Sequence, residues 1–314
     1  METTFTINIL CATDDHYVPY CGIMLTSLFE NNRQHQLCTY ILTDELTEKN
    51  LSMFSQLAER YNTPIHMVKV SAGDLPQSLP LTAHYSLPTY YRLLAPTLLP
   101  SDVERIIYFD CDMIIDSDIE SLWNENIDTV AFGGVLDAVF QGMYHRDWNM
   151  PENTITINTG MLLINLQYWR SHSIAERCFD YIREHPTQIK FVDQSAINHV
   201  VMKEKEYVLL SIKYNFQTFF LHKEMLFNEH IADEIKQTAC SCVVIHYTSK
   251  PWLKYSYVKD PYHHKYLYYR SISLWKNYPL VCNFTRGQRM SLFLYNIACA
   301  ICFRKRTQIY NTSQ

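Results

Sequence analysis

The chain has 314 residues with 32 acidic and 27 basic side chains, a formal net charge of −5, so no overall positive field attracts DNA or RNA and we expect no nucleic-acid partner. Hydrophobic residues make up 47% and charged residues 19% of the sequence, a balance that supports a large buried core and excludes extensive disorder. Only seven glycines occur, and GxGxxG and GxxxxGK[ST] are both absent, which excludes a glycine-rich phosphate loop of either kind.

The first residues, METTFTINILCATDD, lack the basic segment, apolar stretch and cleavage site of a secretory signal. We therefore expect a cytoplasmic protein whose ten cysteines are free thiols in a reducing environment.

Strand-like and helix-like patterns alternate along the chain. The predicted elements, in chain order, are a strand at 5–12, a helix from Pro19, a strand at 37–42, a helix at 46–61, and strands at 65–70, 105–109, 130–136, 155–166 and 243–246. The helix at 46–61 is expected to carry Leu51, Phe54, Leu57 and Ala58 on one face. This alternation predicts an α/β fold with a mostly parallel central sheet that is covered by helices on both faces.

Carboxylate and imidazole side chains follow several of the predicted strands. They are Asp14 and Asp15, Asp110 and Asp112, Asp137, and His246. Ligands of parallel sheets bind beyond the carboxyl ends of the strands, so these residues are candidates for a site. Asp110 and Asp112 share one face of an extended backbone and can reach the same cation, while Cys111 points away. Without a cation such a group would repel itself.

The bare DxD pattern has a second interpretation, a strand-to-loop turn with two solvated aspartates. The carboxylates at the other strand ends favour a divalent cation instead. Carboxylates together with one imidazole suit manganese better than calcium, and leave positions open for phosphate oxygens.

Six motifs in a fixed order give this sequence a resemblance to a known family. They are CATDDHY at 11–17, LPTYYRLLAP at 87–96, IIYFDCDMII at 106–115, INTGMLLINLQYWR at 157–170, FVDQSAIN at 191–198 and HYTSKPW at 246–252. The sequence resembles the retaining glycosyltransferases of family 8, which include glycogenin and bacterial lipopolysaccharide galactosyl- and glucosyltransferases. The resemblance implies a single Rossmann-like GT-A (nucleotide-diphospho-sugar transferase) domain at 1–260, followed by a helical C-terminal extension at 261–314.

The resemblance also implies roles for individual residues. Asp110, Asp112 and His246 would hold Mn²⁺, with Mg²⁺ as the alternative, against the diphosphate of a UDP-sugar. The implied uridine contacts are Ala12, Asp14 and Tyr17, the implied diphosphate contact is Lys250, and the implied sugar-binding and catalytic set is Arg92, Asp137, Asn158, Asp193 and Gln194.

Two positions depart from the family pattern. The segment from His246 to Lys250 is two residues shorter than the usual HxxGxxKPW and lacks its glycine, so Lys250 is expected to reach the phosphate differently. Ser195 stands where many relatives carry a further aspartate. Because Gln194 is a poor nucleophile, the resemblance implies same-face attack assisted by the departing diphosphate.

These observations predict a metal-dependent, retaining hexosyltransferase. It would move galactose or glucose from UDP-galactose or UDP-glucose to a saccharide or lipid-linked glycan acceptor, in the biosynthesis of lipopolysaccharide or another surface glycan. Two alternatives stay open: a metal-dependent nucleotidyltransferase or nucleotide hydrolase, and a non-catalytic sugar-nucleotide-binding protein. HYTSKPW and INTGMLLIN argue against the first of them.

The C-terminal segment has a composition of its own. Arg286 and Arg289 precede an apolar run at 292–303, and three basic residues follow at 304–306. The run is shorter than the roughly 20 apolar residues that span a bilayer. An apolar helix with basic ends predicts peripheral contact with the anionic cytoplasmic face of the inner membrane. A helix docked on the domain is the alternative, and for the tyrosine-rich segment 255–269 packing against the domain is expected.

Overall fold

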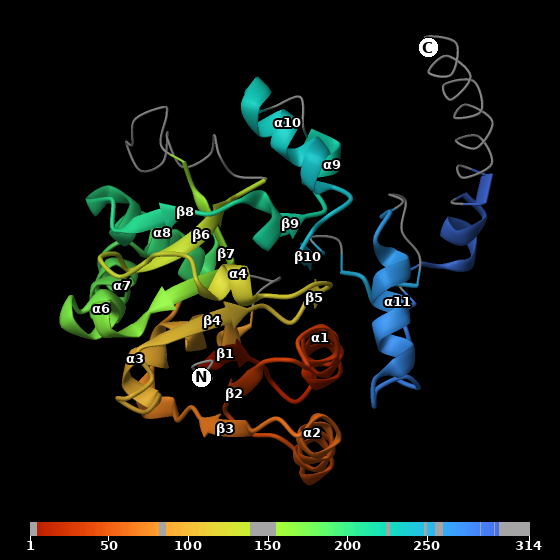
Figure 1. The fold of residues 1–314 in the computed structure, drawn as a ribbon, viewed down its shortest axis with the longest axis horizontal. Coiled ribbons are helices and arrows are strands. Elements are labelled where there is room, and N and C mark those ends of the chain that lie inside the picture. The colour runs from red at the N-terminus through yellow and green to blue at the C-terminus, as the bar shows by residue number, and fades with distance from the viewer. Residues whose placement is uncertain are drawn as a thin grey trace.

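The computed structural model describes residues 5–81, 86–138, 155–223, 227–247, 250–254, 260–282, 284–291 and 293–294. A seven-stranded sheet runs through its centre (Figure 1). In spatial order its strands are β3 (Ile65–Lys69), β2 (Gln36–Thr43), β1 (Thr6–Ala12), β4 (Arg105–Phe109), β7 (Ile157–Asn165), β6 (Phe132–Leu136) and β8 (Tyr207–Leu209). The predicted mostly parallel α/β fold is thereby confirmed.

Strand β7 is the one member of this sheet, among its described strands, that runs antiparallel to its neighbours. It pairs antiparallel with both β4 and β6, whereas the other pairs are parallel. As a result, the first residues of β7 lie beside the last residues of β6, with Ile157 opposite Leu136. Asn158 therefore reaches the same sheet edge as the carboxyl ends of the parallel strands.

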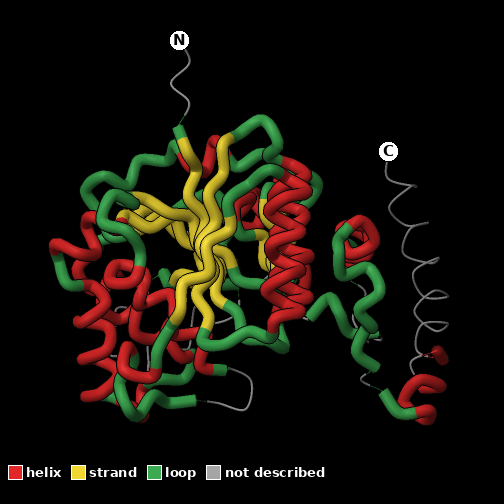
Figure 2. The backbone as a smooth tube through the Cα atoms, turned by 90° about the horizontal axis from the view of Figure 1, so that it is seen from below, coloured by secondary structure: helices red, strands yellow, loops and turns green. Residues whose placement is uncertain are grey.

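The alternation of side chains along the central strands builds two hydrophobic cores. In β1, Ile7 and Ile9 face one core and Leu10 faces the other. In β4, Ile107 faces the first of these cores and Tyr108 the second. Helices cover both faces (Figure 2). On the first face lie α1 (Val18–Asn31) and α2 (Glu48–Tyr61). On the second lie the 3₁₀ helix Leu87–Leu94, α6 (Leu166–Ser171), α7 (Ile174–Glu184) and α8 (Val192–Glu204).

The remaining helices are short or peripheral. They are α3 (Ala95–Leu98), α4 (Glu120–Trp123), α9 (Phe220–Lys223), α10 (Glu229–Thr238) and α11 (His263–Ile272). In α2, Phe54 and Leu57 are buried, whereas Leu51 is 39% exposed. Phe54 and Leu57 are thus the residues of this face that α2 buries fully in the core.

The predicted strand at 243–246 does not join the central sheet. It forms β10 (Val244–His246) in a separate three-stranded sheet, between β5 (Met113–Ile115) and β9 (Phe216–Gln217). Strands of two or three residues leave no periodicity in a sequence, so β5 and β9 could not be predicted. This small sheet brings His246 to the residues that follow β4.

Helix α11 and the nearby Trp275 pack against α1. Tyr262, Tyr266 and Tyr269 are buried, which confirms packing for the described part of the tyrosine-rich segment. At Gly22 of α1 the ring of Trp275 comes so close that a Cβ atom would lie 2.1 Å from it. Helix α11 lies beside α1 in both views (Figures 1 and 2).

Candidate active site

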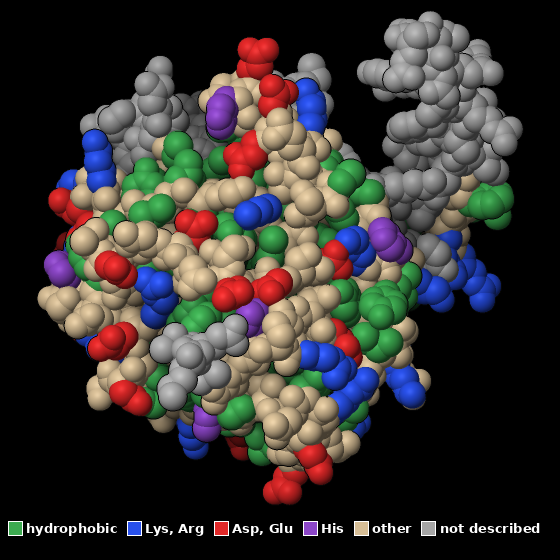
Figure 3. Space-filling view, viewed as in Figure 1, with side chains coloured by type: hydrophobic (Ala, Val, Ile, Leu, Met, Phe, Trp, Pro, Cys, Tyr) green, Lys and Arg blue, Asp and Glu red, His purple; other side chains and the backbone are tan. Residues whose placement is uncertain are grey.

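A cleft of about 530 Å³ opens at the carboxyl ends of β1, β4 and β6. Twelve of the residues singled out from the sequence line it: Ala12, Asp14, Tyr17, Arg92, Asp110, Asp112, Asp137, Asn158, Asp193, Gln194, His246 and Lys250. Acidic side chains gather beside a histidine near the centre of the face seen in Figure 3. The structure brings the predicted residues together, and their roles stay predictions.

Asp110, Asp112 and His246 lie together in the cleft. One ligand atom from each lies within 4.8 Å of the others. His246 Nε2 is 3.3 Å from Asp112 Oδ1. The group is set by β10 pairing with β5, where His246 lies opposite Met113. Cys111 turns away from it and donates a hydrogen bond to the carbonyl of Ala12.

The pKa shifts of Asp110 and His246 indicate the charge of the ligand that this group would bind. Burial raises the pKa of Asp110, and the nearby Asp112 adds to this rise, although Arg92 opposes it. Burial lowers the pKa of His246, but the two aspartates outweigh it and leave this pKa above the ordinary value. Both shifts show a site that favours added positive charge. Two carboxylates and an imidazole are suitable ligands for a borderline divalent metal, so the donor set fits a manganese-type cation.

Gly160 of β7 makes room for these side chains. Its carbonyl accepts a hydrogen bond from the backbone N–H of Asp110 at 2.8 Å. A Cβ atom here would lie 2.5 Å from His246 Cε1 and 2.8 Å from Asp110 Oδ2. Any larger residue would therefore displace two members of the group.

Arg92 is buried between two carboxylates. Its guanidinium lies 2.9 Å from Asp110 Oδ1 and 3.0 Å from Asp193 Oδ2, and it stacks over the ring of Tyr108 at 4.0 Å. Tyr108 also donates a hydrogen bond to Asp110. These contacts make Arg92 a bridge between the proposed cation ligands and Asp193, rather than the partner of a surface carboxylate.

Asp193 carries an unusual carboxyl group. Burial raises its pKa to about 7, against the opposing effect of Arg92. Its Oδ1 atom is buried and has no hydrogen-bond partner among the described residues. The preceding Val192 has a φ of 40°, a conformation that costs a β-branched residue about 1–3 kcal/mol and often occurs at functional sites. The start of α8 thus holds an acceptor oxygen at the cleft.

Asp137 accepts hydrogen bonds from two side-chain amides. Its Oδ2 accepts hydrogen bonds from Asn158 at 3.1 Å and from Gln194 at 3.0 Å. The other end of the Gln194 amide accepts from the backbone N–H of Thr159 at 3.1 Å. Ser195, by contrast, bonds through Oγ to the backbone N–H of Phe191, so its hydroxyl supports the start of α8.

The predicted nucleotide contacts lie where β1 turns into α1. Asp14 Oδ1 accepts hydrogen bonds from the backbone N–H groups of His16 and Tyr17 at 3.0 and 2.9 Å. The ring of Tyr17 packs edge-on against Trp252 with 5.8 Å between centroids. Lys250, two residues before Trp252, has a φ of 51°. Asp15 does not line the cleft and instead bonds to Thr47 at the start of α2.

The sequence interpretation missed two buried amides next to the predicted residues. Asn215 bonds to both His246 and Asn158. Gln217 accepts from the N–H of Ala138 and donates to the carbonyl of Leu136, so it holds the backbone on either side of Asp137. Asn215 lies in a turn and Gln217 in the two-residue strand β9. The sequence offered one indication of their roles, namely two amide side chains two residues apart.

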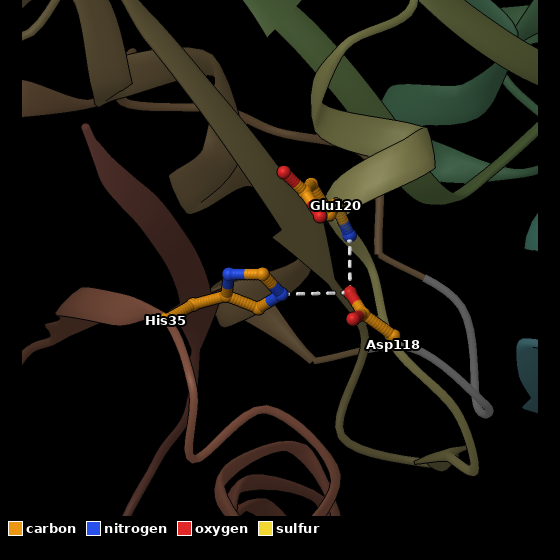
Figure 4. A group of neighbouring side chains, drawn as sticks. All are labelled: His35, Asp118 and Glu120. Atoms are coloured by element: carbon orange, nitrogen blue, oxygen red, sulfur yellow. Dashed lines mark hydrogen bonds and ion pairs between the residues drawn. The ribbon is translucent and has the colours of Figure 1, made fainter. Parts of the chain in front are cut away.

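A second group of potential ligands lies at the other end of the sheet, before β2 begins. Figure 4 shows His35, Asp118 and Glu120, whose ligand atoms also lie within 4.8 Å of one another. Here Asp118 already accepts hydrogen bonds from His35, from Gln34 and from the backbone N–H of Glu120. These bonds account for the arrangement without a cation.

A mostly parallel sheet with aspartates after β4 and a histidine brought beside them defines an α/β transferase of the GT-A type. The family model described as Glycosyl transferase family 8 matches residues 8–256, and the chain belongs to this family. It is therefore a glycosyltransferase, which confirms the enzyme class predicted from the sequence and sets aside the nucleotidyltransferase alternative.

Named relatives cover most of the chain. General stress protein A of Bacillus subtilis (strain 168) is 26% identical over 278 residues, 86% of this chain and 94% of the relative. A lipopolysaccharide 1,2-glucosyltransferase of Escherichia coli is 26% identical over 282 residues, 87% of this chain and 80% of the relative. The lipopolysaccharide 1,3-galactosyltransferase of Salmonella typhimurium (strain LT2) is 22% identical over 289 residues, 90% and 82% of the two chains.

Solved structures share the fold. The galactosyltransferase LgtC, crystallised in complex with donor and acceptor sugar analogs, superimposes with a TM-score of 0.74 at 19% identity, covering 90% of this chain and 99% of LgtC. The glycosyltransferase GlyE of Streptococcus pneumoniae TIGR4 gives a TM-score of 0.65 at 19% identity and covers 87% and 62% of the two chains. These similarities confirm the GT-A fold predicted from the sequence.

Proposed function

We propose that this glycosyltransferase moves a hexose, galactose or glucose, from a UDP-sugar to a saccharide acceptor of a lipid-linked surface glycan, with retained configuration and with the help of a divalent cation. The observation that carries this proposal is the convergence of Asp110, Asp112 and His246 within 4.8 Å at the carboxyl edge of the sheet. Relatives named as lipopolysaccharide glucosyl- and galactosyltransferases support the acceptor class.

We divide the residues of the cleft among three parts of this donor. We assign the uridine to Ala12, Asp14 and Tyr17, the diphosphate to Lys250 and to a cation held by Asp110, Asp112 and His246, and the hexose to Asp137, Asn158, Asp193 and Gln194. Mn²⁺, with Mg²⁺ as the alternative, would supply Lewis-acid stabilisation of the leaving diphosphate. Lys250 adds a point charge there.

The sugar end of the cleft offers acceptor oxygens to hydroxyl groups. The buried Oδ1 of Asp193 has no protein partner among the described residues, so a sugar hydroxyl can satisfy it. Arg92 holds this carboxylate in place. Both ends of the Gln194 amide are bonded to Asp137 and Thr159, which supports a role in orientation and not in covalent attack.

The transfer itself is proposed to occur on one face of the sugar. The bond from the anomeric carbon to the diphosphate oxygen breaks as the acceptor oxygen approaches from the same side. The departing diphosphate oxygen accepts the proton of the acceptor hydroxyl, so no protein nucleophile is needed.

Radiolabelled donors test this proposal. The purified chain should transfer label from UDP-galactose or UDP-glucose to a soluble oligosaccharide when Mn²⁺ is present. Alanine variants of Asp110, Asp112 and His246 should lose Mn²⁺-dependent UDP-sugar binding in calorimetry while keeping their fold, because each variant removes one of the three proposed protein ligands of the cation. Unchanged nucleotide affinity in all three variants would refute the cation site. Release of nucleoside monophosphate, or binding without turnover, would refute hexosyl transfer.

The domain boundaries and the cellular location are part of the same proposal. We assign residues 1–260 to the catalytic domain and 261–314 to an extension whose last part contacts an anionic membrane surface from the cytoplasm. In the described part of the extension, Met290, Phe293 and Leu294 are 59–62% exposed. Residues 295–314 lie outside the described residues. Across the described parts of the chain, no helix has the length and apolar character needed to cross a membrane.

Deletion of residues 286–314 should move the protein from the membrane fraction to the soluble fraction. Basic residues near an anionic surface contribute about 1 kcal/mol each to such binding, and the deletion removes several of them while leaving α11 on the domain. Activity on a short soluble acceptor should persist. Flotation with anionic liposomes measures the effect and zwitterionic liposomes serve as the control; equal flotation of the full and shortened chains would contradict the membrane contact.

A further inference from the structure

Asn215 links the proposed cation site to the proposed sugar site, whose residues belong to different sequence motifs. It lies between the 3₁₀ helix Ile212–Tyr214 and β9, and it is fully buried. Its Nδ2 donates a hydrogen bond to Asn158 Oδ1 at 2.9 Å, and its Oδ1 lies 3.0 Å from His246 Nδ1. One side chain thus touches a proposed cation ligand and a proposed sugar contact.

The directions of the hydrogen bonds that link Asn215, Asn158 and Asp137 follow from neighbouring groups that can only donate or only accept. A backbone N–H can only donate, and Gly160 N–H faces Asn158 at 3.1 Å, so this atom of Asn158 is its oxygen. The other end of the same amide then donates to the Asp137 carboxylate, which can only accept when ionised. The atom of Asn158 that faces Asn215 is therefore its acceptor oxygen Oδ1. Asn215 must place its NH₂ group, and not its oxygen, against this atom.

The same reasoning fixes the imidazole. With its NH₂ facing Asn158, Asn215 presents its oxygen to His246, so Nδ1 must carry a hydrogen. When only Nδ1 carries hydrogen, the Nε2 lone pair points toward Asp112 Oδ1, which is 3.3 Å away. A proton on Nε2, or a metal cation bound by both atoms, removes the repulsion between these two acceptors.

We propose that Asn215 is a positioning residue that holds His246 with Nε2 free for the cation and ties the cation site to Asn158 and Asp137 of the sugar site. This inference rests on the proposed function of the cleft. Metal-bound histidines generally donate their second N–H to a fixed acceptor, and loss of that acceptor typically weakens metal affinity by about 10- to 100-fold.

Two substitutions separate the two halves of this role. Asn215→Leu removes both hydrogen bonds at similar volume, so it should weaken Mn²⁺ binding by about 10- to 100-fold and also disturb the sugar site. Asn215→Asp keeps an acceptor for His246 but faces Asn158 Oδ1 with a second acceptor. This variant should bind Mn²⁺ at least as tightly as the unmodified chain, and still lose kcat because Asn158 and Asp137 lose their support.

A buried asparagine remote from the cleft provides the control. Asn32, after α1, is also fully buried and bonds to the carbonyl of Leu28 and the N–H of Ile119. Asn32→Leu should lower the stability of the fold about as much as Asn215→Leu does, because it also removes buried hydrogen bonds, but it should leave Mn²⁺ affinity unchanged.

The experiment is a titration of the full chain and these variants with Mn²⁺ alone, followed by electron paramagnetic resonance, together with transfer kinetics. Weaker binding for Asn215→Leu, with binding kept in Asn215→Asp and Asn32→Leu, is expected. Unchanged Mn²⁺ affinity in folded Asn215→Leu, or lost affinity in folded Asn215→Asp, would overturn the inference while the proposed function stands. If Asp112→Ala binds Mn²⁺ as well as the unmodified chain does, the cation site of the proposed function fails instead.

Discussion

Replacing Gly160 with alanine should strongly weaken Mn²⁺-dependent nucleotide binding. The new Cβ atom would lie 2.5 Å from His246 Cε1, 2.8 Å from Asp110 Oδ2 and 2.9 Å from Met113 Cε, closer than Cβ atoms come to other heavy atoms in folded proteins. Two of these neighbours belong to the proposed cation ligands and the third is the β5 residue paired with His246. We expect Mn²⁺ affinity to fall by about 100-fold, the upper end of what lost support around a metal costs.

A second glycine gives the matched control for this change. A Cβ atom at Gly73, in the 3₁₀ helix Ala72–Asp74, would meet nothing within 4 Å, so Gly73→Ala should bind Mn²⁺ and UDP as the unmodified chain does. Calorimetry with and without Mn²⁺ measures both, and circular dichroism establishes that the variants are folded. Normal Mn²⁺ affinity in folded Gly160→Ala would show that the cation lies elsewhere.

The sequence predicts the parts of this site that follow long, regular strands. Strands β1, β4 and β6 are apolar runs, and the carboxylates after them could be assigned to one sheet edge because parallel strands end on the same side. Asp14, Asp110 and Asp137 were predictable in this way. Motif resemblance then added the residues that no periodicity indicates, such as Arg92 and Gln194.

What could not be predicted depends on long-range pairing. The direction of β7 decides which end of that strand reaches the cleft, and it is set by pairing with β4 and β6 and not by its own apolar sequence. The two-residue strand β9 is held in place by its pairing with β10, far along the chain, so Asn215 and Gln217 carried no signal of their roles. The need for glycine at 160 appears only when His246, 86 positions later in the numbering, packs against it.

The removal of the Gln194 amide should separate turnover from nucleotide binding. Its Nε2 donates to Asp137 and its Oε1 accepts from Thr159 N–H, while the proposed uridine contacts belong to β1 and the start of α1. Gln194→Ala therefore takes one amide from Asp137 at the sugar end. Loss of one hydrogen bond to a charged group costs about 1.5–3 kcal/mol, which corresponds to a kcat about 10- to 100-fold lower if the contact acts in the transition state.

Affinity for UDP in the presence of Mn²⁺ should stay close to that of the unmodified chain, since the substitution leaves Ala12, Asp14 and Tyr17 in place. Gln188→Ala is the control, because Gln188 bonds to Tyr181 in the short 3₁₀ helix Pro186–Gln188 and does not line the cleft. Steady-state transfer kinetics and UDP calorimetry on both variants separate the two effects. If folded Gln194→Ala loses UDP affinity and keeps its kcat, the residue serves the nucleotide, and the division of the cleft into uridine and sugar ends is wrong.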